Sequence, residues 1–341
     1  MANDEKVISA DHLSIGYPIK GSTGKIIKKD ICLNAMKGEL VAMIGGNGVG
    51  KSTLLRTLIG FQPFFSGNIF IKGLALNNYR EKELAKIMSF VSTETIHVSN
   101  LTVYDLIALG RYPYTDWSGR LTEEDRSKVD EAIQMVGLKG YEDRNVNFIS
   151  DGERQKTMIA RTLAQDTDII LLDEPTAFLD LSNKCEIVHI LHRLAYERGK
   201  TILFSTHDLS IAIAECDKIW LMLEQQVKEG SPEDLILDGS FSSLFHNKSL
   251  YFDTEKGDFR ILKETGQKVI VKGDGAPLNW TIKALERIGF EIITNADSKT
   301  DHTLLEIESS YPSWFLKSSE TREKFNSLYA LCRYLMDSKM E

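Results

Sequence analysis

Short apolar runs alternate with amphipathic segments along the first two thirds of the chain. Residues 53–59 and 181–196 carry apolar side chains at helical spacing. The runs that predict strands are residues 7–17, 40–44, 68–71, 169–172, 201–205 and 219–223. Because strands alternate with helices, we expect an α/β fold built on a parallel sheet.

The stretch from about residue 81 to 168 has a mostly helical pattern. Thr102 is a candidate N-cap for a helix over residues 103–109, and Thr122 opens a second capping pattern with the acidic residues that follow it. We therefore expect a helical subdomain inserted into the α/β unit.

A second, smaller unit follows the loop-rich residues 238–258. Its pattern predicts strands at 268–271, 290–293 and 304–307 and helices at 279–288 and 321–336. We place the two domains at residues 1–240 and 241–341, the second a small accessory α/β domain of unknown role. Gly273-Asp274-Gly275, before the first of these helices, predicts a tight strand-to-helix turn, in preference to a further phosphate site.

A glycine-rich loop joins the apolar run 40–44 to the next helix. Residues 45–52 read Gly-Gly-Asn-Gly-Val-Gly-Lys-Ser and match the pattern G-x-x-x-x-G-K-[ST]. Glycines let backbone N–H groups point at a polyphosphate, and the helix adds its positive N-terminal end. A glycine turn that binds nothing is the alternative, but the flanking strand and helix favour a phosphate loop. The expected phosphate-binding residues are Gly45, Asn47, Gly48, Gly50, Lys51, Ser52 and Thr53, with the Ser52 hydroxyl also a ligand of Mg²⁺.

A second apolar strand candidate, residues 169–172, ends in two carboxylates. Ligands of open α/β sheets bind at the carboxyl ends of strands, so Asp173 and Glu174 are expected beside the phosphate loop. Asp173 would hold Mg²⁺, and Glu174 would act as a general base on the attacking water. A solvated Asp-Glu turn is the alternative.

Three further segments occur in the order that ABC-transporter ATPases share. Residues 148–155 (Phe-Ile-Ser-Asp-Gly-Glu-Arg-Gln) resemble the LSGGQ signature, and residues 177–180 (Ala-Phe-Leu-Asp) resemble the D-loop. Residues 205–208 (Ser-Thr-His-Asp) resemble the switch-histidine segment. The resemblance covers about residues 5–235 and implies a P-loop NTPase core with a helical signature subdomain.

The resemblance also implies ATP hydrolysis with Mg²⁺ between two subunits of a head-to-tail homodimer. Ser150 and the N–H of Gly152 would contact the γ-phosphate across the dimer interface, aided by the N-terminus of the helix that follows. His207 would position the water, Asp180 would belong to the site, and Tyr17 would stack on adenine. Without the resemblance, Tyr17 and His207 would be interpreted as packing or surface residues.

Two segments depart from the family pattern. Asp151 stands where the signature has glycine, so its carboxylate should weaken γ-phosphate binding unless it is paired or points away. Thr93, followed by Glu94, stands where the family has a glutamine that touches Mg²⁺. Glu94 is the replacement metal ligand that we expect, since its carboxylate is a hard oxygen donor.

Residues 101–114 (Leu-Thr-Val-Tyr-Asp-Leu-Ile-Ala-Leu-Gly-Arg-Tyr-Pro-Tyr) resemble ATPases of importers for ferric siderophores, haem and cobalamin. An ordinary amphipathic helix ended by Gly110 and Pro113 explains the same pattern. The resemblance implies transmembrane permease subunits and a substrate-binding protein as partners. It also implies a cytoplasmic protein, peripheral on the inner face of the plasma membrane.

The formal net charge of −8 argues against a nucleic-acid partner. The four cysteines are far apart, which predicts reduced thiols and neither disulfides nor a zinc site. Two alternatives to a transport motor remain open. One is a soluble ABC-type ATPase in DNA repair or translation, and the other is a nucleotide-gated regulatory subunit with weak turnover.

Overall fold

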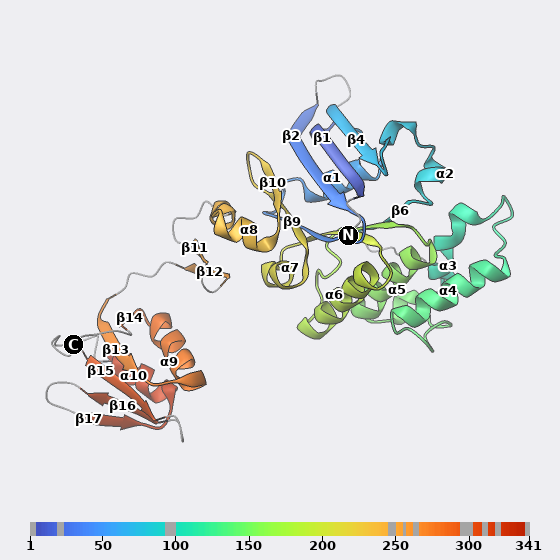
Figure 1. Ribbon diagram of the computed structural model, residues 1–341. Helices are drawn as coiled ribbons and strands as arrows, with labels where there is room; N and C mark the ends of the chain where they lie inside the picture. The colour runs from blue at the N-terminus through green and yellow to red at the C-terminus, as the bar shows by residue number, and fades with distance from the viewer. Residues whose placement is uncertain are drawn as a thin grey trace. The chain divides into compact units, whose positions relative to one another are not determined.

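The computed structural model describes residues 5–18, 24–92, 100–244, 250–254, 257–261, 266–293, 303–308, 313–317 and 322–337. The chain divides into two compact units, Met1–Arg260 and Ile261–Glu341 (Figure 1). This division lies later than the expected boundary after residue 240. The reason is that Phe241 and Phe252 are buried in the core of the first unit and stack on each other, with ring centroids 5.1 Å apart.

The first unit is built on a six-stranded sheet with the order β10-β9-β3-β8-β7-β6. Its strands are β3 (Leu40–Gly45), β6 (Met88–Val91), β7 (Ile169–Leu172), β8 (Thr201–Thr206), β9 (Lys218–Met222) and β10 (Val227–Gly230). All neighbours pair in parallel except β10, which runs antiparallel to β9. The predicted parallel α/β sheet is therefore confirmed.

A second, antiparallel sheet has the order β2-β1-β4-β5, with β1 (Lys6–Tyr17), β2 (Lys25–Met36), β4 (Ser66–Ile71) and β5 (Leu74–Ala75). The apolar face of helix α1 (Lys51–Leu58) packs between this sheet and β3, where Leu54 and Leu58 share one core with Leu13 and Met43. Figure 1 shows α1 beneath β1 and β2. The sequence pattern missed β2.

The helical subdomain contains α2 (Glu81–Leu84), α3 (Val103–Ala108), the 3₁₀ turn η2 (Leu109–Tyr114), α4 (Glu123–Met135) and α5 (Asp151–Ala164). Strand β6 lies within this mostly helical stretch, at residues 88–91, where the family resemblance implies a strand. Thr102 and Thr122 each begin a helix with a reciprocal capping box, as predicted. The helices α6 (Leu181–Tyr196), α7 (Leu209–Glu215) and α8 (Pro232–Leu237) complete the unit.

The Gly110-Arg111 pair ties the helical subdomain together internally. The Arg111 guanidinium is buried. It donates through Nε to Asp125 (2.7 Å) and through Nη1 to the Ala164 carbonyl (2.9 Å). The Tyr114 ring lies 3.9 Å from the guanidinium carbon. A Cβ on Gly110 would stand 2.1 Å from the Arg161 carbonyl oxygen. The Gly-Arg-x-Pro sequence at residues 110–113 therefore has a packing role within the helical subdomain, whichever type of transporter it indicates.

The second unit is a five-stranded mixed sheet with the order β14-β13-β15-β16-β17. Its elements are β13 (Lys268–Lys272), α9 (Gly275–Arg287), β14 (Glu291–Ile293), β15 (Thr303–Glu308), β16 (Ser313–Lys317), β17 (Arg322–Phe325) and α10 (Leu328–Asp337). A short hairpin of β11 (Leu250–Asp253) and β12 (Asp258–Ile261) precedes it. The turn at Gly273–Gly275 joins a strand to a helix, as predicted.

The predicted helix over residues 321–336 is wrong in its first part. Residues Arg322–Phe325 form β17 and pair with β16, and the helix begins only at Leu328. The helical spacing of Phe325 with Leu328, Leu331 and Leu335 arises because all four side chains face the same apolar core.

Candidate nucleotide site

The phosphate-loop residues connect β3 to α1 at the carboxyl edge of the parallel sheet. Gly48 (φ 74°) and Gly50 (φ 109°) adopt left-handed conformations that are costly for residues with a Cβ. A Cβ on Gly45 would stand 2.6 Å from the Met222 carbonyl oxygen, so the loop is also packed closely against β9. The loop thus has the shape that its glycines predict, and it places Ser52 and the buried Thr53 in the first turn of α1.

The Lys51 ammonium is buried and surrounded by acceptors. Nζ donates to the carbonyls of Gly45 (2.9 Å) and Gly46 (3.3 Å), and lies 3.2 Å from Nε2 of His207. It is 4.0 Å from the Glu174 carboxylate. Burial lowers the pKa of Lys51, and the carboxylates of Glu174 and Asp173 oppose that shift. The structure therefore places one cation at the centre of the predicted site.

One hydroxyl contacts both residues that follow β7. Ser205 on β8 donates to Oδ1 of the buried Asp173 (2.8 Å) and accepts from the backbone N–H of Glu174 (2.8 Å). Glu174 has φ 47°, a left-handed conformation that is uncommon outside glycine. Ser205 lay inside the quoted switch-histidine segment, but nothing in its spacing revealed this role.

His207 follows β8 directly and reaches the same point. Its Nε2 lies 2.7 Å from the Glu174 carboxylate as well as near Lys51. The structure thus brings Lys51, Asp173, Glu174 and His207 together. These are the groups needed to hold a polyphosphate and to place a base beside it.

An open cleft of about 470 Å³ lies over the phosphate loop. Tyr17 lines it, half-exposed, and its hydroxyl is 3.0 Å from Oγ1 of Thr53. A nucleotide-sized ligand fits a cleft of this volume. Lys25, Ile26 and Ile27 of β2 also line the cleft, and the sequence pattern missed them together with their strand. The described residues that line the cleft do not include Ser150, Gly152 or Asp180.

The signature residues form a separate surface at the start of α5. Ser150 caps the helix in a capping box with Glu153, and Asp151 pairs with Arg154 at 3.0 Å. Asp151 is therefore paired, which is one of the two conditions under which its carboxylate is not expected to weaken γ-phosphate binding. A Cβ on Gly152 would stand 2.6 Å from Oδ1 of Asn183, a residue of α6 that the sequence pattern did not single out.

Large apolar side chains next to the signature and the D-loop are open to solvent. Phe148 is 87% exposed, Phe178 97% and Leu181 74%. Asp180 is the N-cap of α6 and accepts from the N–H of Asn183. Such a concentration of exposed apolar side chains is typical of a surface that meets another protein. Glu94, the expected metal ligand, and Thr93 lie outside the described residues.

Comparisons with known proteins agree with this geometry. Residues 28–177 match the ABC transporter family, and residues 266–336 match the iron ABC transporter C-terminal domain. An uncharacterized ABC transporter ATP-binding protein of Methanocaldococcus jannaschii is 36% identical, over 75% of this chain and 87% of its own. The iron(3+)-hydroxamate import ATP-binding protein FhuC of Bacillus subtilis is 35% identical, over 70% of this chain and 87% of its own.

A solved dimer of an ATP-binding cassette, in a post-hydrolysis state with ADP and Pi, superposes with a TM-score of 0.58 and 27% identity. The match covers 66% of this chain and 98% of that one. Within the described residues, no helix is both long and apolar enough to cross a membrane. The chain belongs to the family of ABC transporter ATP-binding proteins, which are transport ATPases.

Proposed function

We propose that this protein is the ATP-hydrolysing subunit of an importer for ferric siderophores and sits on the inner face of the membrane that contains its permease. The observation that carries the cargo class is the second unit, residues 266–336, which matches an iron-transporter domain. The name of the FhuC relative supports the same class. The soluble ATPase of DNA repair or translation is not favoured, since these relatives are transporter subunits.

The residues present fit ATP with Mg²⁺. The phosphate loop offers backbone N–H groups and Lys51, while Ser52 and Asp173 offer the hard oxygen donors that Mg²⁺ prefers. A bound Mg²⁺ would neutralise phosphate charge. Glu174 would accept a proton from water, and His207 would hold the Glu174 carboxylate in place. Ser205 would fix the Asp173 carboxylate and the backbone of Glu174 through its two hydrogen bonds.

Two copies would complete the site. The signature surface of one copy, with Ser150 and Gly152, would close over the phosphate loop of the other, because neither residue lines the cleft of its own chain. The exposed side chains of Phe148 and Phe178 would be covered in that dimer.

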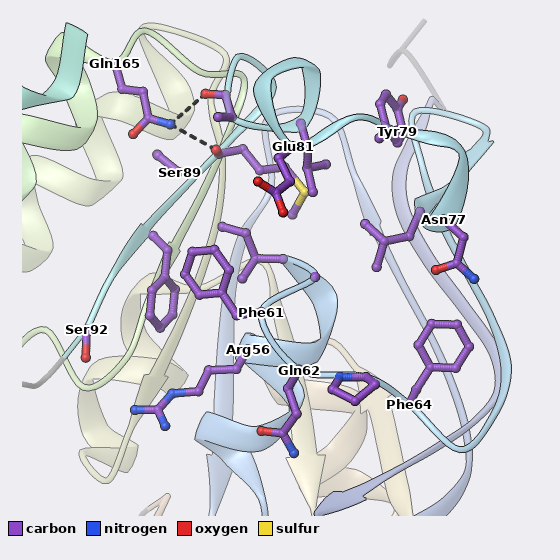
Figure 2. Close-up of a pocket in the computed structure, with 18 of the residues that line it drawn as sticks. Arg56, Phe61, Gln62, Phe64, Asn77, Tyr79, Glu81, Ser89, Ser92 and Gln165 are labelled. Atoms are coloured by element: carbon purple, nitrogen blue, oxygen red, sulfur yellow. Dashed lines mark hydrogen bonds between the residues drawn. The ribbon is translucent and has the colours of Figure 1, made fainter. Parts of the chain in front are cut away.

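A groove of about 1180 Å³ would receive the permease. Its walls come from residues 59–64, α2, β6 and α5, and Phe61 packs edge-on against Phe90 with centroids 5.8 Å apart. Figure 2 shows Phe61 and Phe64 on opposite sides of the open space. Phe61 is 70% exposed, so an apolar helix of the permease would find a partner there.

The decisive experiment is uptake by the reconstituted transporter. A ferric hydroxamate chelate should enter vesicles that contain ATP, and Glu174→Gln should abolish uptake while ATP binding and dimerisation persist. Uptake of cobalamin or haemin, without ferric hydroxamate, would refute the cargo. A Glu174→Gln protein that stays monomeric with ATP at high concentration would refute the ATP-closed dimer.

The groove is tested by isolating the complex from membranes. Phe61→Asp should lose the multi-span membrane protein, whereas Leu237→Asp, an equally polar change at an exposed leucine of α8, should retain it. Equal recovery with both variants would place the permease elsewhere.

A further inference from the structure

Three side chains that bind metals well meet on the outer surface of the antiparallel sheet. His12 projects from β1, and Asp30 and Cys32 project from β2, all exposed to solvent. Each offers one ligand atom, and these atoms all lie within 4.8 Å of one another. They play no part in the nucleotide site. The cysteine spacing, which predicts no zinc site, did not reveal them because only the pairing of β1 with β2 brings the three side chains together.

The backbone conformation at this point places the side chains of His12, Asp30 and Cys32 close together. The pairing of β1 with β2 shifts register between Ala10↔Leu33 and Leu13↔Ile31. His12 (φ 49°) lies within this shift and Asp30 (φ 56°) within the next one, between Leu13↔Ile31 and Ile15↔Lys28, and both take left-handed conformations. Only a few per cent of residues other than glycine do so. On the other side of β1, Gly67 leaves no room for a Cβ, which would stand 2.5 Å from the His12 carbonyl oxygen. The bulge is therefore held by strands on both sides.

The side chains already contact one another. Nδ1 of His12 is 2.6 Å from Oδ1 of Asp30, and the backbone N–H of His12 donates to Sγ of Cys32 at 3.4 Å. Each partner thus has its position limited by another member of the group, which reduces the entropy lost when a cation binds.

We propose that His12, Asp30 and Cys32 form a surface site for a late first-row divalent cation such as Zn²⁺. Imidazole nitrogen, carboxylate oxygen and thiolate sulfur are the ligands of protein zinc sites, and three of them leave a fourth position for water. The thiolate excludes Mg²⁺ and Ca²⁺, which take oxygen ligands. Among divalent iron, cobalt and zinc, such a site holds iron least tightly.

This site is separate from the Mg²⁺ expected at Ser52 and Asp173, which offer only oxygen donors. It lies on the two strands whose far ends, Tyr17 and Lys25, line the nucleotide cleft. A bound cation cross-links β1 to β2 and so stabilises the hairpin that carries Tyr17.

The test uses the full-length protein without a histidine tag, with Co²⁺ as a spectroscopic probe and Zn²⁺ measured by calorimetry. Wild-type protein should bind one equivalent and show the absorption band of cobalt bound to a thiolate. Cys32→Ser should lose the band and weaken Zn²⁺ binding by about tenfold or more. His12→Asn removes the imidazole but suits a left-handed backbone, and should weaken binding similarly.

Cys185 is the matched control, because it is also an exposed free cysteine but lies on α6. Cys185→Ser should bind Co²⁺ and Zn²⁺ like the wild type. Equal thermal unfolding midpoints without metal would show that the variants fold. The proposal fails if wild-type protein shows no thiolate band, if the band survives Cys32→Ser, or if Cys185→Ser removes it.

Discussion

The hydroxyl of Ser205 donates a 2.8 Å hydrogen bond to the buried carboxylate of Asp173. The same oxygen accepts the N–H of Glu174, whose backbone is left-handed. One hydroxyl therefore sets the position of the expected metal ligand and of the expected base.

Ser205→Ala should lower ATP turnover by about tenfold, because a hydrogen bond to a charged group contributes roughly 1.5–3 kcal/mol. A higher Mg²⁺ concentration should be needed for half-maximal activity, with little change in nucleotide affinity. Steady-state assays across a Mg²⁺ series check this. Ser240→Ala removes another buried, hydrogen-bonded serine hydroxyl away from the site and should leave these constants alone. Wild-type Mg²⁺ dependence in Ser205→Ala would contradict the assignment.

Tyr17 has two parts that substitutions can test separately. Its ring lines the cleft, and its hydroxyl contacts Thr53. If the ring stacks on adenine, Tyr17→Ala should raise the Kd for ATP about tenfold, because stacking of a base on an aromatic ring contributes roughly 1–3 kcal/mol. Tyr17→Phe keeps the ring and should bind nearly as tightly as the wild type. Fluorescence titration with a nucleotide analogue measures both. Equal losses in the two variants would assign the effect to the hydroxyl.

Gly152→Ala should block ATP-dependent dimerisation, because the new Cβ would overlap the Asn183 side chain and displace the start of α5. Removing that side chain as well, in Gly152→Ala/Asn183→Ala, should restore much of the dimer. Analytical ultracentrifugation in a Glu174→Gln background measures both variants. If the double variant stays as defective as the single one, the clash with Asn183 is not the cause.

Breaking the buried pair of Arg111 and Asp125 should destabilise the first unit. Arg111→Ala leaves a buried carboxylate without its charged partner and should cost about 3–5 kcal/mol in urea unfolding. Arg111→Lys should recover only part, since lysine cannot reproduce the guanidinium geometry. Full stability of Arg111→Ala would contradict the role assigned to the pair.

The same pair predicts a pH dependence. Burial by itself would raise the pKa of Asp125, but hydrogen bonds from Thr122 and Arg111, and the Arg111 charge, hold it below its ordinary value. The stabilisation is therefore complete above the ordinary aspartate pKa of about 3.9 and is lost as the pH falls through the lowered value. Unfolding titrations below pH 4 should show a steeper loss for the wild type than for Arg111→Ala.

The buried strands and the longest helices could be predicted because each has one dominant pattern. Residues 181–196 form a helix and residues 169–172 a strand with the expected ends. Strand β2 was missed because its lysines and its register shifts obscure the alternation of buried and exposed positions. The break at residues 326–327 was missed because apolar residues on both sides of it face one core.

The site shows the same limit. Motif spacing brought Lys51, Asp173, Glu174 and His207 to one place, as the structure has them. Ser205, Asn183 and the wall of β2 act through contacts between elements far apart in the chain, and no local pattern encodes such contacts. The pairing of Asp151 also could not be predicted, because it depends on the Arg154 side chain pointing toward Asp151 across one turn of the helix.

The contacts of Lys51 have a consequence for how ATP binding affects the rest of the site. Its ammonium already faces the carbonyls of Gly45 and Gly46 and Nε2 of His207, so an incoming anion must compete with these partners for the same three N–H groups. An anion that drew Lys51 outward would also take its ammonium away from the Glu174 carboxylate, from which it lies 4.0 Å. We therefore expect the binding of ATP and the surroundings of the expected base, Glu174, to be coupled through this one lysine.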